Sequence, residues 1–149
     1  MDKKLIDCAI EAMKTSYSPY SSFKVGAALL CKNGKIFTGV NIENASFSAT
    51  NCAERTAFFK AVSEGEKEFL SIAVVGGKNG EIVDYCAPCG VCRQVMAEFC
   101  DKDFEILLFN GENIKKYTLD DIFPISFEMG VKLLRECMML YRKTGTAVY

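Results

Sequence analysis

The rest of the chain is organised around two stretches, Cys52-Ala53-Glu54 and Pro88-Cys89-Gly90-Val91-Cys92. Together they place three thiols and one carboxylate on the first turns of two predicted helices. Three sulfurs can hold a zinc ion and leave its fourth position open to water. A carboxylate two residues from one of the sulfurs can move protons to and from that water. The alternative is that these residues are ordinary buried cysteines.

The spacing of the cysteines in the second stretch favours a metal site. Cys89 and Cys92 are three residues apart at a predicted helix start, so both sulfurs lie on one side of the first turn. A helix N-terminus favours negative charge, which helps thiols to ionise. Cys86 forms a second pair with Cys89 at the same spacing, but it lies beyond Pro88 in a predicted loop. We therefore prefer Cys92 to Cys86 as the third ligand.

The chain contains no histidine, which excludes His-based catalytic dyads and triads. Any zinc site must therefore use sulfur and carboxylate. Structural zinc sites normally have four ligands, whereas here only Cys52 joins the pair, and it brings a glutamate instead of a second cysteine. This incomplete ligand set favours a catalytic site. The other cysteines are predicted to be small buried hydrophobic residues: Cys8, Cys31, Cys86, Cys100 and Cys137.

The bulk composition indicates a single small domain over residues 1–149. A formal net charge of -1 and a pI of about 5.6 argue against a nucleic-acid partner, which normally calls for a basic stripe. No stretch resembles a signal peptide or reaches the length of a membrane span. We therefore expect a cytoplasmic protein that does not bind membranes, with its eight cysteines reduced.

Strands and helices alternate along the chain. Apolar runs predict strands at residues 25–31, 35–40, 70–75 and 104–109, and a short edge strand at 115–118. Helical periodicity predicts helices at residues 2–16, 51–64, 89–100 and 128–143, and a brief helical turn at 120–122. Asn33-Gly34 predicts a hairpin, and residues 41–50 a loop that can carry function. We expect an α/β fold, a three-layer α/β/α sandwich around one mixed β-sheet of about five strands. The last helix is expected to dock on the core or on a neighbouring subunit.

Four motifs, in order, resemble those of small zinc-dependent cytidine deaminases. They are Tyr20-Ser21-Ser22-Phe23-Lys24-Val25-Gly26-Ala27-Ala28-Leu29, Asn41-Ile42-Glu43-Asn44-Ala45-Ser46, Cys52-Ala53-Glu54-Arg55-Thr56-Ala57 and Pro88-Cys89-Gly90-Val91-Cys92-Arg93-Gln94. The resemblance implies a cytidine deaminase-like fold. It also implies hydrolytic deamination of cytidine and deoxycytidine to uridine and deoxyuridine, with release of ammonia, in pyrimidine salvage.

The same resemblance implies a role for each site residue. One zinc per chain is expected on Cys52, Cys89 and Cys92, with Glu54 as the proton shuttle. Three thiolates on Zn²⁺ leave a formal charge of about -1, which an Arg55 guanidinium donating to the sulfurs would offset. The expected substrate-binding residues are Phe23 against the nucleoside, Asn41 and Glu43 on the ribose hydroxyl, the Ala53 N–H on the base, and Phe127 from a neighbouring subunit.

The resemblance further implies a homotetramer whose sites are completed across subunit interfaces. Phe47 stands where relatives often carry tyrosine, so a hydroxyl contact made there is missing. Two alternatives remain open at this point. The same chemistry could act on an aminopyrimidine antibiotic such as blasticidin S or on a base within RNA or DNA. The chain could instead be a non-catalytic zinc or thiol-redox module.

Overall fold

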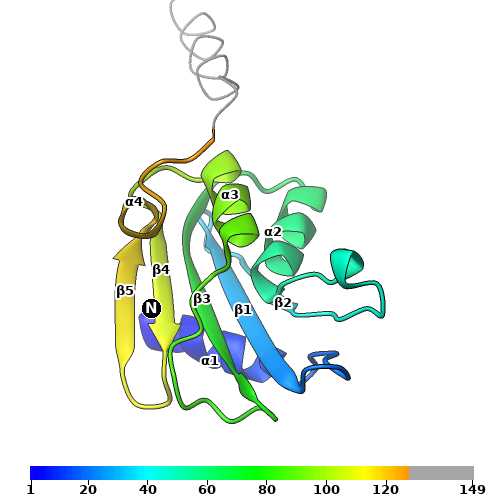
Figure 1. Ribbon diagram of the computed structural model, residues 1–149. Coiled ribbons are helices and arrows are strands. Elements are labelled where there is room, and N and C mark those ends of the chain that lie inside the picture. Colours follow the sequence, from blue (N-terminus) through cyan, green and yellow to red (C-terminus); the bar gives the residue numbers. More distant parts are fainter. Residues whose placement is uncertain (128–149) are drawn as a thin grey trace, which may run out of the picture.

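The computed structural model describes residues 1–127, which form one mixed β-sheet with helices on both faces (Figure 1). The strands are β1 Phe23–Cys31, β2 Ile36–Val40, β3 Phe69–Lys78, β4 Glu105–Phe109 and β5 Ile114–Thr118. The helices are α1 Asp2–Met13, α2 Ala53–Ser63, α3 Gly90–Phe99 and α4 Leu119–Ile122, with a 3-10 turn at Phe47–Ala49. The predicted helix at 128–143 and Cys137 lie outside the described residues.

The five strands lie in the order β2-β1-β3-β4-β5. Only β3 and β4 pair in parallel, and α3 forms the crossover between them, as parallel neighbours require. The other three pairings are antiparallel, including the predicted Asn-Gly hairpin between β1 and β2. One mixed five-stranded sheet with helices on both faces confirms the predicted three-layer α/β/α fold.

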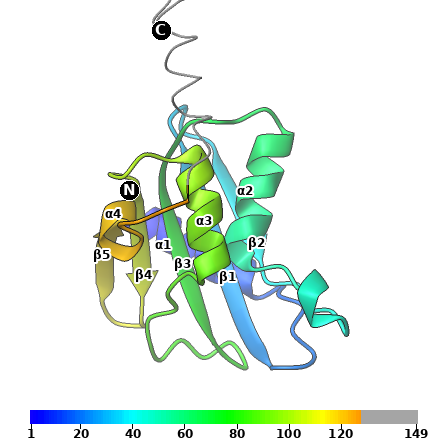
Figure 2. The same ribbon diagram turned by 45° about the horizontal axis from the view of Figure 1, so that its top comes forward.

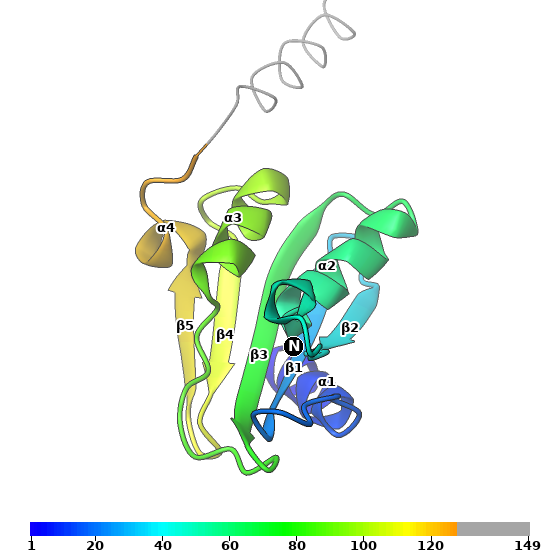
Figure 3. The ribbon, with the colours of Figure 1, turned by 45° about the vertical axis from the view of Figure 1, so that its right-hand side comes forward.

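Helices cover both faces of the sheet (Figure 3). An apolar layer lies between the sheet and the helices on each face. Successive side chains of a strand point to opposite faces. Ala28 and Leu30 of β1 accordingly pack in the layer beneath α1, whereas Leu29 and Cys31 pack in the layer beneath α2 and α3. Helix α2 packs very closely on the sheet. A Cβ on Gly39 of β2 would lie only 2.3 Å from the Ala53 carbonyl oxygen. The start of α2 is thereby fixed against the edge strand.

Strand direction brings the starts of α2 and α3 together (Figure 2). Strand β1 is antiparallel to both β2 and β3, so β2 and β3 run in the same direction. Their carboxyl ends therefore lie at the same end of the sheet, and the helices that follow them begin there. This arrangement determines where the site forms.

Several predicted boundaries move. The first helix ends at Met13 instead of residue 16, and the Ser16 hydroxyl donates to Asn41 instead. Helices α2 and α3 begin one or two residues later than predicted, because Cys52 and Cys89 have extended N-cap backbones. Among the predicted buried cysteines that are described, Cys31 and Cys100 are buried, whereas Cys8 and Cys86 are half-buried. Within residues 1–127, no helix is long and apolar enough to cross a membrane.

Candidate active site

Three sulfurs meet where α2 and α3 begin. Cys52 is the N-cap of α2, Cys89 is the N-cap of α3, and Cys92 follows in the first turn of α3. The Cys52 and Cys89 Sγ atoms are 3.8 Å apart, and the Cys89 and Cys92 Sγ atoms are 3.5 Å apart. All three sulfurs lie within 4.8 Å of one another, whereas Cys86 is not a member of this group.

This arrangement fits one zinc ion. Zn–S bonds of about 2.3 Å in tetrahedral geometry place neighbouring sulfurs about 3.8 Å apart. The observed separations match that spacing, and a three-sulfur set leaves the fourth tetrahedral position for water. Two helix N-termini also direct their positive ends at the sulfurs, which stabilises thiolates. Cys52, Cys89 and Cys92 could therefore hold the metal.

The Cys52 and Cys92 thiols differ in pKa. The pKa of Cys52 falls from 9.0 to about 5, because its sulfur accepts hydrogen bonds from Cys92 and from Arg55. Donation to Cys52, together with burial, raises the pKa of Cys92. A metal ion bound to both sulfurs would displace the shared proton, since thiol ligands bind as thiolates.

Arg55 lies beside the Cys52 sulfur. Its Nη2 donates to the Cys52 Sγ atom at 3.7 Å and to the Thr50 carbonyl oxygen at 3.1 Å. The carbonyl contact holds the guanidinium beside the sulfur. The sequence did not indicate Thr50, because a backbone carbonyl is not identified by its side chain.

Glu54 is the second residue of α2 and is only 4% exposed. Burial raises the pKa of its carboxyl group, and the negative charge of Cys52 raises it further. A buried carboxyl group that keeps its proton more readily is suited to general acid and base catalysis. Ala53 precedes it at the first helical position, where the helix ladder offers the N–H no acceptor. Ala53 itself is fully buried.

Cys86 lies beside the site in a different role. A Cβ placed on Gly76 would lie 2.8 Å from the Cys86 Sγ atom and 3.1 Å from the Phe23 ring. Burial raises the pKa of the Cys86 thiol to about 12. The Cys86 side chain is therefore a neutral thiol packed next to Phe23 over β3.

Asn41 is buried, and its amide is occupied by the segment that leads into β1. Its Oδ1 accepts from the Ser16 hydroxyl at 2.5 Å and from the Val25 N–H at 2.7 Å. Its Nδ2 donates to the Phe23 carbonyl oxygen at 2.8 Å. Asn41 thus fixes the backbone of Phe23, a role that the sequence did not indicate.

Glu43 holds the same segment from its other side. Its carboxylate accepts from the backbone N–H groups of Tyr20 at 2.9 Å and Ser21 at 3.2 Å, and also from the Ser21 hydroxyl. These bonds lower the pKa of Glu43, with the Ser21 hydroxyl as the largest cause. A cavity of about 340 Å³ opens beside this carboxylate, and its lining residues are Tyr20, Ser21, Glu43, Phe47 and Thr50.

The remaining predicted residues are exposed. Phe23 is 40% exposed and Phe127 is 71% exposed. Phe47 packs edge to face on Tyr20, with ring centroids 6.5 Å apart. The Phe127 carbonyl oxygen accepts from the Gln94 side chain at 2.8 Å, so Phe127 is tied to α3. A larger cavity of about 550 Å³ lies between α1, β2 and α2, but none of the three sulfur residues lines it.

Comparison with known proteins agrees with this geometry. Residues 1–108 match the family described as "Cytidine and deoxycytidylate deaminase zinc-binding region". The chain is 49% identical over 129 residues to a cytidine deaminase of Halalkalibacterium halodurans, covering 85% of this chain and 95% of that relative. It is 32% identical over 130 residues to a blasticidin-S deaminase of Bacillus cereus, covering 85% of this chain and 91% of that one.

A solved structure agrees as well. The crystal structure of a cytidine deaminase from Burkholderia pseudomallei superposes with a TM-score of 0.79 at 45% identity. The match covers 85% of this chain and 99% of that one.

Proposed function

Because the chain belongs to the cytidine and deoxycytidylate deaminase family, we propose that it hydrolyses cytidine and deoxycytidine to uridine and deoxyuridine, releasing ammonia. Family membership confirms the resemblance found in the motifs and identifies the chain as a zinc-dependent hydrolase. The observation that carries the proposal is the sulfur triad of Cys52, Cys89 and Cys92 next to the buried Glu54. A structural or redox site would not need that carboxyl group.

Glu54 transfers the protons in this reaction. A zinc ion on the three sulfurs would make water a usable nucleophile at neutral pH. The Glu54 carboxylate takes a proton from the attacking water and delivers it to N3 of the pyrimidine. It then takes the remaining proton from the new hydroxyl group at C4 and passes it to the amino group. The C4–N bond breaks, ammonia leaves and the C4 carbonyl forms. The Ala53 N–H binds the base and keeps C4 within reach.

Arg55 sets the charge of the site. Three thiolates and Zn²⁺ together carry about -1, which by itself would make bound water a weaker acid. The Arg55 guanidinium, which already donates to the Cys52 sulfur, withdraws charge from that ligand. With zinc bound, this contact would restore acidity to the water that Glu54 deprotonates.

Substrate binding is proposed for Phe23, Glu43 and Asn41, with Phe127 contributed by a neighbouring subunit. Asn41 would use the second Nδ2 hydrogen, because the first donates to the Phe23 carbonyl oxygen. The exposed Phe23 ring and the cavity beside Glu43 support a nucleoside with a free sugar hydroxyl. The exposure of Phe127, at 71%, supports its use by a second copy of the chain in a homotetramer. The enzyme would form one domain over residues 1–149, act in the cytoplasm, where thiol ligands stay reduced, and take no nucleic acid as a substrate.

The ultraviolet absorbance of cytidine tests the proposal directly. Purified zinc-loaded protein is expected to convert cytidine to uridine, to lose that activity on chelation and to regain it with added zinc. The variant Glu54→Gln should keep its zinc and lose nearly all turnover. Blasticidin S is tested as the competing substrate, because one relative is named a blasticidin-S deaminase. Unchanged cytidine, or a clear preference for blasticidin S, would contradict the proposal.

A further inference from the structure

The Ser21 hydroxyl lies between two of the proposed substrate-binding residues. It donates to the Glu43 carboxylate and accepts from the Phe23 N–H at 2.9 Å. One hydroxyl group therefore links the carboxylate proposed to bind the sugar with the backbone of the aromatic residue proposed to pack on the nucleoside. Ser21 itself has no assigned part in the reaction.

The segment around Ser21 needs such a link. Ser22 has a φ of 57°, a left-handed conformation that non-glycine residues adopt only when their surroundings hold them. Asn41 holds the carbonyl oxygen of Phe23, whereas the Phe23 N–H bonds to Ser21 Oγ. The hydroxyl thus completes the fixation of Phe23 at the entrance to β1.

The carboxylate of Glu43 remains able to bind a ligand. A carboxylate offers about four acceptor positions. Two backbone N–H groups and the Ser21 hydroxyl occupy three of the Glu43 positions. Both Ser21 and Glu43 line the cavity of about 340 Å³, so the remaining position can meet a hydroxyl group that enters there.

We propose that Ser21 is a positioning residue for nucleoside binding, and that it holds Glu43 and Phe23 in the relative orientation that a sugar-bearing substrate needs. The inference rests on the proposed function. It goes beyond it by placing control of sugar recognition in a hydroxyl that need not touch the substrate. Its effect should fall on KM, because the proton chemistry of Glu54 lies in a different segment.

Steady-state kinetics on two substrates test this role. Ser21→Ala should raise KM for cytidine about tenfold, as expected when a charge-assisted hydrogen bond is lost, and leave kcat within about twofold. For 2′,3′-dideoxycytidine, whose sugar lacks the hydroxyls, KM should rise only about twofold, because only the Phe23 contact is affected. Ser21→Thr retains the hydroxyl and should behave like the wild type.

Two controls separate positioning from simple folding effects. Ser18→Ala lies in the same segment, and the Ser18 hydroxyl bonds to none of the residues described, so its kinetics should be unchanged. In a Glu43→Gln background, Ser21→Ala should raise the cytidine KM by less than about twofold, since linked residues are not additive. If Ser21→Ala does not fold, Ser21→Cys replaces it, and its weak thiol donor should raise KM partway.

The opposing outcomes are distinct. An unchanged cytidine KM in Ser21→Ala, or in Ser21→Cys if that variant is used, overturns the positioning role, as does an equal KM rise for both substrates. A fall in kcat at constant KM overturns it too. If the wild-type protein leaves cytidine intact, the proposed function fails and this inference fails with it. If the wild-type enzyme is active but substitution of Ser21 leaves the KM for cytidine unchanged, only the inference is contradicted.

Discussion

At the scale of single residues, Cys86 and Cys92 make the sharpest contrast. Both lie three residues from Cys89, so spacing alone allows either as a zinc ligand. The Cys92 sulfur lies 3.5 Å from the Cys89 sulfur, whereas the Cys86 thiol packs over Gly76 beside Phe23. Pro88 and the start of α3 lie between the two cysteines in the chain.

Metal analysis of two matched variants tests this difference. Cys92→Ser should lose bound zinc and with it activity, because only two sulfur ligands remain. Cys86→Ser should keep about one zinc per chain, since its thiol is not in the sulfur group. Zinc content measured after gel filtration decides the matter. Zinc retained by Cys92→Ser and lost from Cys86→Ser would reverse the assignment.

At the scale of secondary-structure elements, α3 does more than carry two sulfurs. The Arg93 Nε donates to the Pro88 carbonyl oxygen at 2.8 Å, just before Cys89. Its Nη1 donates to the Ile122 carbonyl oxygen at the end of α4, also at 2.8 Å. Arg93 therefore braces the loop that presents Cys89 against a segment about thirty residues further along the chain.

Replacing Arg93 should loosen the metal site. Arg93→Ala removes both braces, and we expect zinc to be lost at roughly tenfold lower chelator concentration, as for other residues that support metal ligands. Gln94→Ala is the matched control, because within residues 1–127 the Gln94 side chain donates to the Phe127 carbonyl oxygen and to no residue near the sulfurs, so it should not affect zinc retention. Chelator titration with a zinc-sensitive dye measures both. Equal zinc loss in the two variants would argue against a specific brace.

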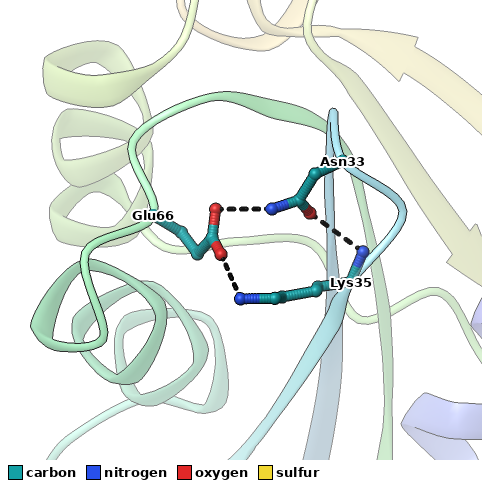
Figure 4. Close-up of polar contacts among 3 residues, drawn as sticks. All are labelled: Asn33, Lys35 and Glu66. Carbon is teal, nitrogen blue, oxygen red and sulfur yellow. Dashed lines mark hydrogen bonds and ion pairs between the residues drawn. The ribbon is translucent and has the colours of Figure 1, made fainter.

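A second contact between elements joins the β1–β2 hairpin to the loop that follows α2 (Figure 4). The Glu66 carboxylate accepts from the Lys35 Nζ at 2.7 Å and from the Asn33 Nδ2 at 2.9 Å. The Lys35 hydrogen bond is the main cause that lowers the pKa of Glu66 below its ordinary 4.5. A carboxyl group with a depressed folded-state pKa stabilises the fold above its unfolded pKa, and this stabilisation is lost as pH falls through the folded value.

Glu66→Gln should therefore destabilise the protein in a pH-dependent way. We expect Tm to fall by roughly 1–3 °C at pH 7, where the ion pair is complete, and the difference from wild type to shrink below about pH 4. Glu68→Gln is the control, since Glu68 is 74% exposed in its pair with Lys32, whereas Glu66 is 17% exposed. Thermal unfolding at several pH values measures the difference. A Tm loss that does not vary with pH would refute the ion-pair explanation.

At the scale of the whole molecule, Phe127 is one of several large apolar side chains that are exposed among the described residues. In the proposed homotetramer, its ring would enter the site of a neighbouring chain. Phe127→Ala should then keep the tetramer and raise KM, as measured by light scattering and kinetics.

Mixed tetramers give the decisive form of this test. A Glu54→Gln chain still supplies Phe127, and a Phe127→Ala chain still supplies Glu54. Refolding the two inactive or weakened variants together should therefore recover part of the wild-type kcat/KM. No gain over the separate variants would place Phe127 in its own chain's site or in none.

The sequence by itself predicted the local features of this protein. Apolar runs predicted the strands, and the Asn-Gly pair predicted the first hairpin. Both features form between residues that are close together in the chain. The spacing of Cys89 and Cys92 predicted two sulfurs on one helical turn for the same reason. The pattern of Cys52 with Glu54 predicted a catalytic site once the absence of histidine was noted.

Only the tertiary structure decided which distant groups meet. Cys52 reaches Cys89 because β2 and β3 run in the same direction, a consequence of β1 pairing antiparallel with both. The hydrogen bonds of Asn41 and the link from Glu43 through Ser21 depend on residues 41–43 lying beside residues 16–25. Such contacts carry no local signal in the sequence, since the tertiary fold sets the distance between their partners.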